Sequence, residues 1–206
     1  MTIAVFCNGD KISGKVFSRF KDEIDFVICA DGGSDKINHL GITPDIITGD
    51  FDSISKKTLL RYKDTKIIHR EDQNSTDLEK ALNFAVKLKP KKILLFGAYG
   101  DRIDHTLTNL NMLKKFHKNA AIELITNKSK LFYTGKPLEL NESIGTVISL
   151  IPIGCVKAVT ISGFKYPLNK DNLEFGGRDG QSNIVISDKQ KIGFKKGELF
   201  VVINFR

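Results

Sequence analysis

The chain has 206 residues, of which 41% are hydrophobic and 27% charged, and its net charge is +8. This is the balance of a globular protein with one large or two small domains, and no stretch approaches the roughly 20 apolar residues of a membrane span. The N-terminus has no signal-peptide pattern and the three cysteines are scattered, so we expect a cytoplasmic protein without disulfides or a zinc site.

The positive charge is not concentrated in one segment. Lysine pairs occur at 56–57, 91–92, 114–115 and 195–196, and none is interleaved with aromatic side chains. We interpret this charge as a solvated surface and expect no nucleic-acid partner, although a basic nucleic-acid-binding protein stays open as the non-enzyme alternative. The aspartates are less evenly spread, because 13 of the 16 lie in residues 1–104. That concentration indicates a metal or proton-transfer site.

Residues 1–126 alternate short apolar runs with helical patterns. The runs lie at 3–7, 26–30, 46–48, 66–69, 93–96 and 121–125, and the helical patterns lie near 15–22, 34–40, 55–62, 76–88 and 103–117. Continuous apolar strands separated by helices predict an α/β domain with a doubly wound, mostly parallel sheet. Such sheets bind their ligands outside the carboxyl ends of the strands.

The pattern changes near residue 127. Short apolar runs at 131–133, 138–140, 146–151, 156–161, 184–187 and 199–204 are separated by Gly, Pro, Asn and Asp. No long helical period accompanies them, so we predict a C-terminal antiparallel β-sandwich domain over residues 127–206.

Several aspartates fall at one edge of the predicted sheet. Asp31 directly follows the strand at 26–30, and Asp50 and Asp52 follow the strand at 46–48. Asp77 opens the helix at 76–88, and Asp104 follows the strand at 93–96. Because the carboxyl ends of parallel strands share an edge, we expect an active site that gathers these five side chains.

The pair Asp50-x-Asp52 suits a hard cation. Mg²⁺ takes one or two carboxylates and keeps positions for phosphate oxygens and water. The same spacing is also common in turns and caps, and sugar-nucleotide transferases and phosphatases use it as well. We therefore predict a Mg²⁺-dependent phosphotransferase, with another Mg²⁺-dependent transferase or a phosphatase as the enzyme alternative.

Two of the motifs also have a purely structural interpretation. Thr76 begins a T-x-x-E capping box, so helix capping alone would account for Thr76 and Asp77. Gly32 and Gly33 allow the backbone to approach a phosphate closely, but they also allow a tight turn.

Two basic segments could contact phosphate. Residues 9–16 read GDKISGKV and nearly match a P-loop, but Val16 stands where a hydroxyl should reach Mg²⁺, so we do not interpret them as one. Arg102 could clamp a phosphate with two hydrogen bonds, and a surface ion pair is the alternative.

Taken in chain order, the motifs resemble those of the thiamine pyrophosphokinase family. That family carries a DGG turn, a G-D-x-D-S segment, a Q-x-x-T-D segment entering a helix, a G-R-x-D-H segment and a late S-N pair. The matching residues are Asp31-Gly32-Gly33, Gly49-Asp50-Phe51-Asp52-Ser53, Gln73-x-x-Thr76-Asp77, Arg102-x-Asp104-His105 and Ser182-Asn183. The resemblance covers nearly the whole chain, including its two-part layout.

The resemblance implies transfer of the pyrophosphoryl group of ATP to the hydroxyl of thiamine, which gives thiamine diphosphate and AMP. It also implies Mg²⁺ as the cofactor, ATP and thiamine as the small-molecule partners, and a homodimer. The first domain would bind ATP and Mg²⁺, and the second would contribute to the thiamine site and the dimer.

The same resemblance implies a role for each motif residue. The implied sets are Asp50, Asp52 and Asp77 for Mg²⁺; Asp31, Gly32, Gly33, Arg102 and Asp104 for ATP and phosphate; Gln73, Thr76, Ser182 and Asn183 for thiamine; and Asp77, Arg102 and Asp104 for catalysis.

Overall fold

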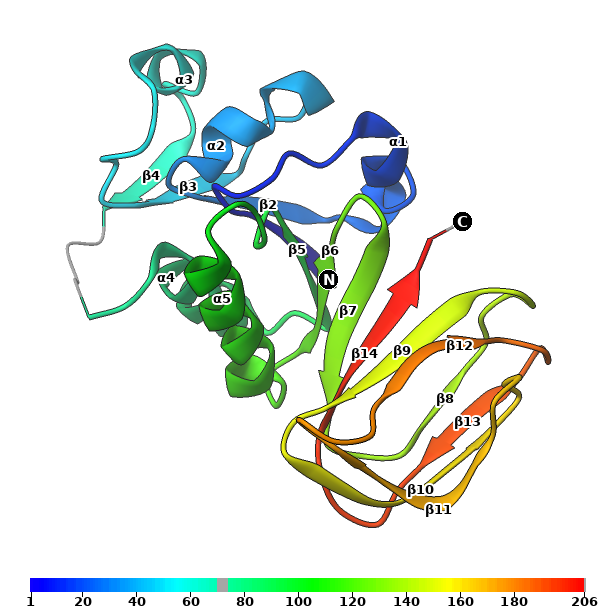
Figure 1. The fold of residues 1–206 in the computed structure, drawn as a ribbon. Coiled ribbons are helices and arrows are strands. Elements are labelled where there is room, and N and C mark those ends of the chain that lie inside the picture. Colours follow the sequence, from blue (N-terminus) through cyan, green and yellow to red (C-terminus); the bar gives the residue numbers. More distant parts are fainter. Residues whose placement is uncertain (70–73, 206) are drawn as a thin grey trace. The chain divides into compact units, whose positions relative to one another are not determined.

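The computed structural model describes residues 1–69 and 74–205, and it divides the chain into two compact units, Met1–Asn127 and Lys128–Arg206 (Figure 1). None of the helices in these described residues is long and apolar enough to cross a membrane.

The first unit is built on six parallel strands. Their spatial order is β6-β5-β1-β2-β3-β4, and neighbouring strands pair in parallel throughout. The strands are β1 (Thr2–Phe6), β2 (Phe26–Ala30), β3 (Ile46–Gly49), β4 (Lys66–His69), β5 (Lys92–Phe96) and β6 (Ala121–Ile125). The inner strands are buried at almost every position, which explains their continuous apolar sequences.

Helices cover the sheet, as a doubly wound fold requires. They are α1 (Gly14–Phe17), α2 (Gly33–Lys36), α3 (Lys56–Arg61), α4 (Asp77–Ala85) and α5 (Ile103–Phe116), with one-turn 3₁₀ helices η1 (Lys21–Glu23), η2 (Asn38–Leu40) and η3 (Val86–Leu88). Helix α2 contacts β1 and β2, while α4 contacts β1, β2, β3 and α5. Figure 1 shows α2 on one side of these strands and α4 and α5 on the other. The predicted α/β architecture is therefore confirmed.

Two predicted helices are shorter than the sequence suggested. The pattern at 15–22 forms only α1 and η1, and the pattern at 34–40 forms only α2 and η2. In the first, the Ser18 hydroxyl donates to the Lys15 carbonyl at 2.9 Å. In the second, the Asn38 amide donates to the Asp35 carbonyl at 3.2 Å. Such local bonds to the backbone compete with continuation of a helix.

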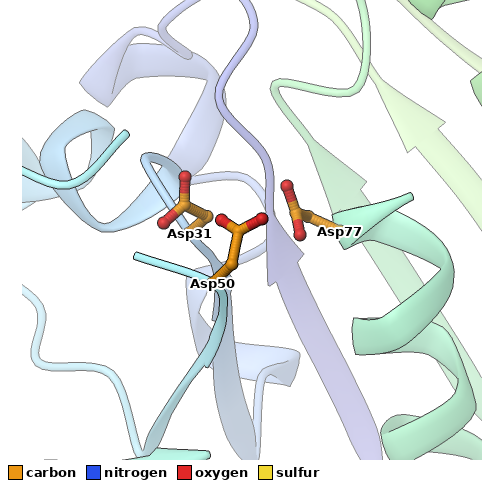
Figure 2. A group of neighbouring side chains, drawn as sticks. All are labelled: Asp31, Asp50 and Asp77. Carbon is orange, nitrogen blue, oxygen red and sulfur yellow. The ribbon is translucent and has the colours of Figure 1, made fainter. Parts of the chain in front are cut away.

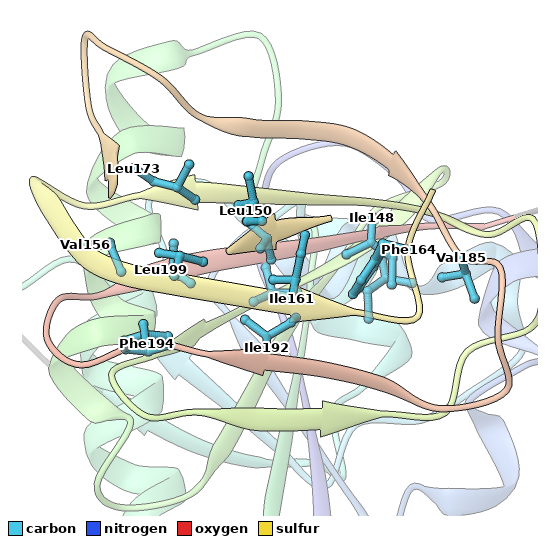
Figure 3. Close-up of a cluster of buried hydrophobic side chains, with 14 residues drawn as sticks. Ile148, Leu150, Val156, Ile161, Phe164, Leu173, Val185, Ile192, Phe194 and Leu199 are labelled. Atoms are coloured by element: carbon cyan, nitrogen blue, oxygen red, sulfur yellow. The ribbon is translucent and has the colours of Figure 1, made fainter. Parts of the chain in front are cut away.

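The second unit contains two antiparallel sheets with the strand orders β12-β9-β14-β7 and β11-β10-β13-β8. The strands are β7 (Ser129–Thr134), β8 (Leu138–Leu140), β9 (Val147–Pro152), β10 (Cys155–Ser162), β11 (Leu168–Glu174), β12 (Gly180–Ile184), β13 (Gln190–Gly193) and β14 (Leu199–Asn204). Buried side chains of both sheets, among them Ile148, Leu150, Ile161 and Ile192, form one apolar core (Figure 3). The predicted sandwich is confirmed.

Three strands of this unit differ from the prediction. β11 and β13 were missed because they are largely polar; β11, for example, buries only Leu168 and Leu173. The strand expected at 184–187 lies instead at β12, which ends at Ile184. A strand with few inward-facing apolar residues has no clear period-two signal.

Candidate active site

The first unit has a topological switch point beside β1. The chain runs from β1 outward through β2, β3 and β4, and then returns to the other side of β1 with β5 and β6. The loops after β1 and β5 meet there, since the Gly9 amide donates to the Gly97 carbonyl and the Asp10 amide to the Tyr99 carbonyl, both at 2.8 Å. A Cβ atom on Gly9 would lie 2.0 Å from the Tyr99 carbonyl oxygen, so only glycine allows this contact. Ligands of open α/β sheets bind at such a point.

A cavity of about 790 Å³ opens at the switch point. Its lining comes from the segments that follow β1, β2, β3 and β5 and from the first turns of α4 and α5. The lining includes five of the residues to which the sequence analysis gave a site role: Asp31, Thr76, Asp77, Arg102 and Asp104. The expectation that separate motifs meet at one sheet edge therefore agrees with the geometry.

Three carboxylates converge beside this cavity. Asp31, Asp50 and Asp77 each offer an oxygen, and these oxygens lie within 4.8 Å of one another. Figure 2 shows the three side chains turned toward one another from the turn after β2, the end of β3 and the start of α4. Carboxylate oxygens are the ligands of a hard divalent cation, so this group could hold one.

Asp31 is the most constrained member of the group. Its side chain is buried, its residue is 2% exposed, and its backbone is left-handed at φ 43°. Oδ2 accepts the Ser53 amide at 3.2 Å, whereas Oδ1 is buried without a hydrogen-bond partner among residues 1–69 and 74–205. Burial raises the pKa of Asp31, and the charges of Asp77 and Asp52 raise it further. A buried, unpartnered oxygen among like charges is the environment that a bound cation would relieve.

Asp77 lies in the first turn of α4, where capping had been the structural alternative. Thr76 is the N-cap, and its Oγ1 accepts the Glu79 amide at 3.2 Å, so the predicted cap is confirmed. The Glu79 carboxylate pairs with Lys115. The Asp77 carboxylate instead accepts Lys80 Nζ at 3.2 Å, and Lys80 is only 9% exposed. The cap therefore makes no use of the Asp77 carboxylate.

Asp52 is not one of the three converging residues in the described part of the chain. Its carboxylate accepts the Ser53 hydroxyl at 2.8 Å. Phe51, between the two aspartates, has a left-handed backbone at φ 67°, and its ring stacks on His69 at 5.4 Å between centroids. A role for Asp52 in metal binding stays a prediction.

Arg102 and Asp104 form a two-point ion pair at the cavity wall. Nη2 and Nε of Arg102 donate to the two Asp104 oxygens at 2.5 and 3.2 Å, and the side chains are 68% and 61% exposed. The hydrogen bond from Arg102 lowers the pKa of Asp104 to about 2, and the same bond raises the pKa of Arg102. Asp104 thereby orients the guanidinium.

The glycines after Asp31 are explained by packing. A Cβ atom on Gly33 would lie 2.1 Å from the Phe6 carbonyl oxygen, and one on Gly32 would lie 2.5 Å from the Asn8 side chain. Both glycines are buried and neither lines the cavity. Their contact with phosphate stays a prediction.

The residues predicted to contact thiamine come from both units of the chain. Gln73 lies outside the described residues. Ser182 and Asn183 belong to β12 of the second unit. The buried Asn183 amide bonds both backbone groups of Tyr166, at 3.0 Å to its amide and 2.6 Å to its carbonyl. Asn183 thus has a structural role, and its contact with thiamine stays a prediction.

The sequence reasoning missed the residues after β1 and the partner of Asp77. Asn8, Gly9 and Asp10 line the cavity, although Gly9 and Asp10 had been considered only as part of a failed P-loop match and Asn8 not at all. Their position at the carboxyl end of the first strand was the available signal. Nothing in the local pattern distinguished Lys80 from the other lysines.

Comparisons with known proteins find matches in both parts of the chain. Residues 17–125 match the family model described as thiamin pyrophosphokinase, catalytic domain, and residues 137–199 match the one described as thiamin pyrophosphokinase, vitamin B1 binding domain. The thiamine pyrophosphokinase of Bacillus subtilis is 32% identical over 98% of this chain and 97% of its own length, and thiamine pyrophosphokinase 2 of Arabidopsis thaliana is 32% identical over 77% and 70%.

Solved structures extend the likeness to the whole fold. The crystal structure of thiamine pyrophosphokinase from Bacillus subtilis covers 100% of both chains at 30% identity, with a TM-score of 0.89. A thiamin pyrophosphokinase from Candida albicans shares the fold at 18% identity, covering 100% of this chain and 89% of its own, with a TM-score of 0.88. This chain therefore belongs to the thiamin pyrophosphokinase family.

Proposed function

We propose that this chain is an enzyme that transfers the pyrophosphoryl group of ATP to the hydroxyl of thiamine, giving thiamine diphosphate and AMP. The observation that carries the proposal is that Asp31, Asp50 and Asp77 converge beside the cavity at the switch point. All three lie within residues 17–125, which match the catalytic-domain model. The match of residues 137–199 to a vitamin B1 binding domain supports thiamine as the acceptor.

Mg²⁺ fits the acidic cluster, because three carboxylates converge and one buried oxygen has no other partner in the described residues. We propose that Asp31, Asp50 and Asp77 hold it, with Asp52 of the same loop as a further ligand. The bound cation would supply positive charge to the phosphates of ATP. The resemblance implied that Asp31 binds ATP and phosphate, whereas the geometry supports Asp31 as a ligand of the metal ion.

The other residues of the cavity would position ATP and offset its charge. The guanidinium of Arg102, oriented by Asp104, would donate to phosphate oxygens as negative charge develops on them. The acceptor hydroxyl oxygen bonds to the β-phosphorus, and the bond from that phosphorus to the oxygen bridging to the α-phosphate breaks. AMP leaves with the bridging oxygen. The hydroxyl proton passes to a nearby carboxylate, for which Asp77 is our candidate.

We further propose that Gln73, Thr76, Ser182 and Asn183 contact thiamine, and that Gly32 and Gly33 serve ATP binding through their backbone. A cytoplasmic homodimer is the working form that we propose. Sedimentation of the purified chain, with and without thiamine, would measure that assembly.

The nature of the nucleotide product tests the reaction. Incubation with Mg²⁺, ATP and thiamine should yield AMP and thiamine diphosphate in equal amounts, and thiamine monophosphate should give little product. Asp50→Asn should abolish turnover while the circular dichroism spectrum stays unchanged, because the amide lacks the charge that a cation needs. ADP as the sole nucleotide product would remove the pyrophosphokinase assignment but leave a kinase. Absence of any thiamine-dependent product would remove both.

A further inference from the structure

The loop between β3 and α3 needs external support to hold its carboxylates in place. It carries Asp50 and Asp52, has no helical or strand hydrogen bonding of its own, and exposes most of its residues. One buried side chain, that of Ile54, anchors it to the core. A binding site on such a loop is well ordered only if neighbouring groups fix the backbone.

Two carboxylates of the neighbouring turn and helix α2 supply polar support. Asp31 accepts the Ser53 amide at 3.2 Å, and Asp35 accepts the Ser55 amide at 3.0 Å. Asp35 also accepts the Ser55 hydroxyl at 2.6 Å and the Thr58 hydroxyl. The loop is therefore held at two points, Ser53 and Ser55, by the carboxylates of Asp31 and Asp35.

We propose that Asp35 is a positioning residue, which holds the loop so that Asp50 reaches the oxygens of Asp31 and Asp77. Asp35 is neither a member of the converging group nor part of the cavity wall in the described residues, so it acts only through the loop. It joins the N-cap of α3, Ser55, to α2, and Thr58 in turn accepts the Asn38 amide at 3.2 Å. Burial is the largest influence on Asp35 and opposes its charge, but the hydrogen bonds from Ser55 and Thr58 outweigh it and lower its pKa.

The inference rests on the proposed function only for the cation, so its test measures cation binding directly. Mn²⁺ alone is titrated into the full chain, and the electron paramagnetic resonance signal of free Mn²⁺ gives the dissociation constant. Residues that orient metal ligands typically change metal affinity by about 10- to 100-fold when removed, so Asp35→Ala should weaken Mn²⁺ binding at least about 10-fold.

Two further variants make the test specific. In Asp35→Asn, the amide oxygen can accept the Ser55 amide while the hydroxyls of Ser55 and Thr58 turn to accept the new NH₂ group, so binding should stay within about threefold of wild type. Asp45 is the matched control, because its carboxylate accepts the Val27 amide at 2.8 Å at the other end of β2 and β3. Asp45→Ala should lose stability but keep the wild-type dissociation constant.

The outcomes separate the two claims. Weakened Mn²⁺ binding in Asp35→Ala, restored in Asp35→Asn and intact in Asp45→Ala, supports the inference. Wild-type affinity in a folded Asp35→Ala variant overturns it and leaves the metal site standing. If Asp35→Ala does not fold, Asp35→Asn decides the question by comparison with Asp50→Asn. Should Asp35→Asn bind Mn²⁺ as weakly as Asp50→Asn does, the inference is also overturned, because the hydrogen bonds that asparagine keeps would then be irrelevant to cation binding. A wild-type chain that binds no Mn²⁺ removes the metal site itself.

Discussion

The first turn of α4 joins a helix cap and a site residue, and neighbouring substitutions should separate them. Thr76→Ala removes the oxygen that accepts the Glu79 amide at 3.2 Å. Loss of such a cap costs about 1 kcal/mol, which in a chain of this length lowers Tm by roughly 2–4 °C. Thr76→Ser keeps the oxygen and should melt close to wild type.

Asp77→Asn should give the opposite result. The substitution loses an attraction to Lys80 at 3.2 Å but relieves repulsion from two carboxylates whose oxygens lie within 4.8 Å. At an effective dielectric constant of about 20, the lost attraction to Lys80 is about 5 kcal/mol, and the relieved repulsion is about 3.5 kcal/mol for each of the two carboxylates. Solvent screening reduces both energies. They largely cancel, and the new amide oxygen still accepts from Lys80. We expect stability within about 1–2 kcal/mol of wild type, with turnover lower by orders of magnitude.

The assay pairs thermal melting at 222 nm with the rate of AMP release at 25 °C. The expected pattern is a lowered Tm with near-normal kcat for Thr76→Ala, and a near-normal Tm with lost kcat for Asp77→Asn. If KM for thiamine rises in Thr76→Ala but not in Thr76→Ser, the result would support the predicted contact between Thr76 and thiamine. Wild-type kcat together with a clearly lowered Tm in Asp77→Asn would refute the reasoning and reduce Asp77 to a helix-start residue.

Three other results are expected. Gly33→Ala should destabilise the fold by about 1–3 kcal/mol in urea unfolding, because its Cβ atom would lie 2.1 Å from the Phe6 carbonyl oxygen; an unchanged midpoint would contradict this packing. At neutral pH a thiol reagent should modify only Cys155 in the native protein and all three cysteines after denaturation, since the other two are buried and burial raises their pKa. Burial, together with the 2.7 Å bond to Glu198, raises the pKa of Tyr133 to about 12. Its contribution to stability should therefore be complete below about pH 10, the usual tyrosine pKa, and be lost as pH rises through about 12; Tyr133→Phe should flatten that alkaline fall, and an unchanged pH profile would exclude the bond as its cause.

Much of the fold followed from local pattern. Continuous apolar runs predicted the parallel strands, because strands buried on both faces have no polar side to show. The period and N-cap of α4 and the period of α5 were equally clear. The sequence placed Asp31, Asp50 and Asp77 at strand or helix ends, and the ordered motifs indicated the family. Polar strands such as β11 carried no comparable signal.

Only the tertiary structure decided which of these side chains meet. The spacing of Asp50 and Asp52 predicted that these two carboxylates bind a cation together, yet the converging group is Asp31, Asp50 and Asp77. That choice depends on strand order, which places β1 between β2 and β5, and on left-handed backbone at Asp31 and Phe51. Strand order arises from contacts between segments far apart in the chain, and a left-handed residue other than glycine has no reliable local signature. The same holds for the contact between Asp35 and Ser55, 20 residues apart, which exists only because packing brings α2 and α3 together.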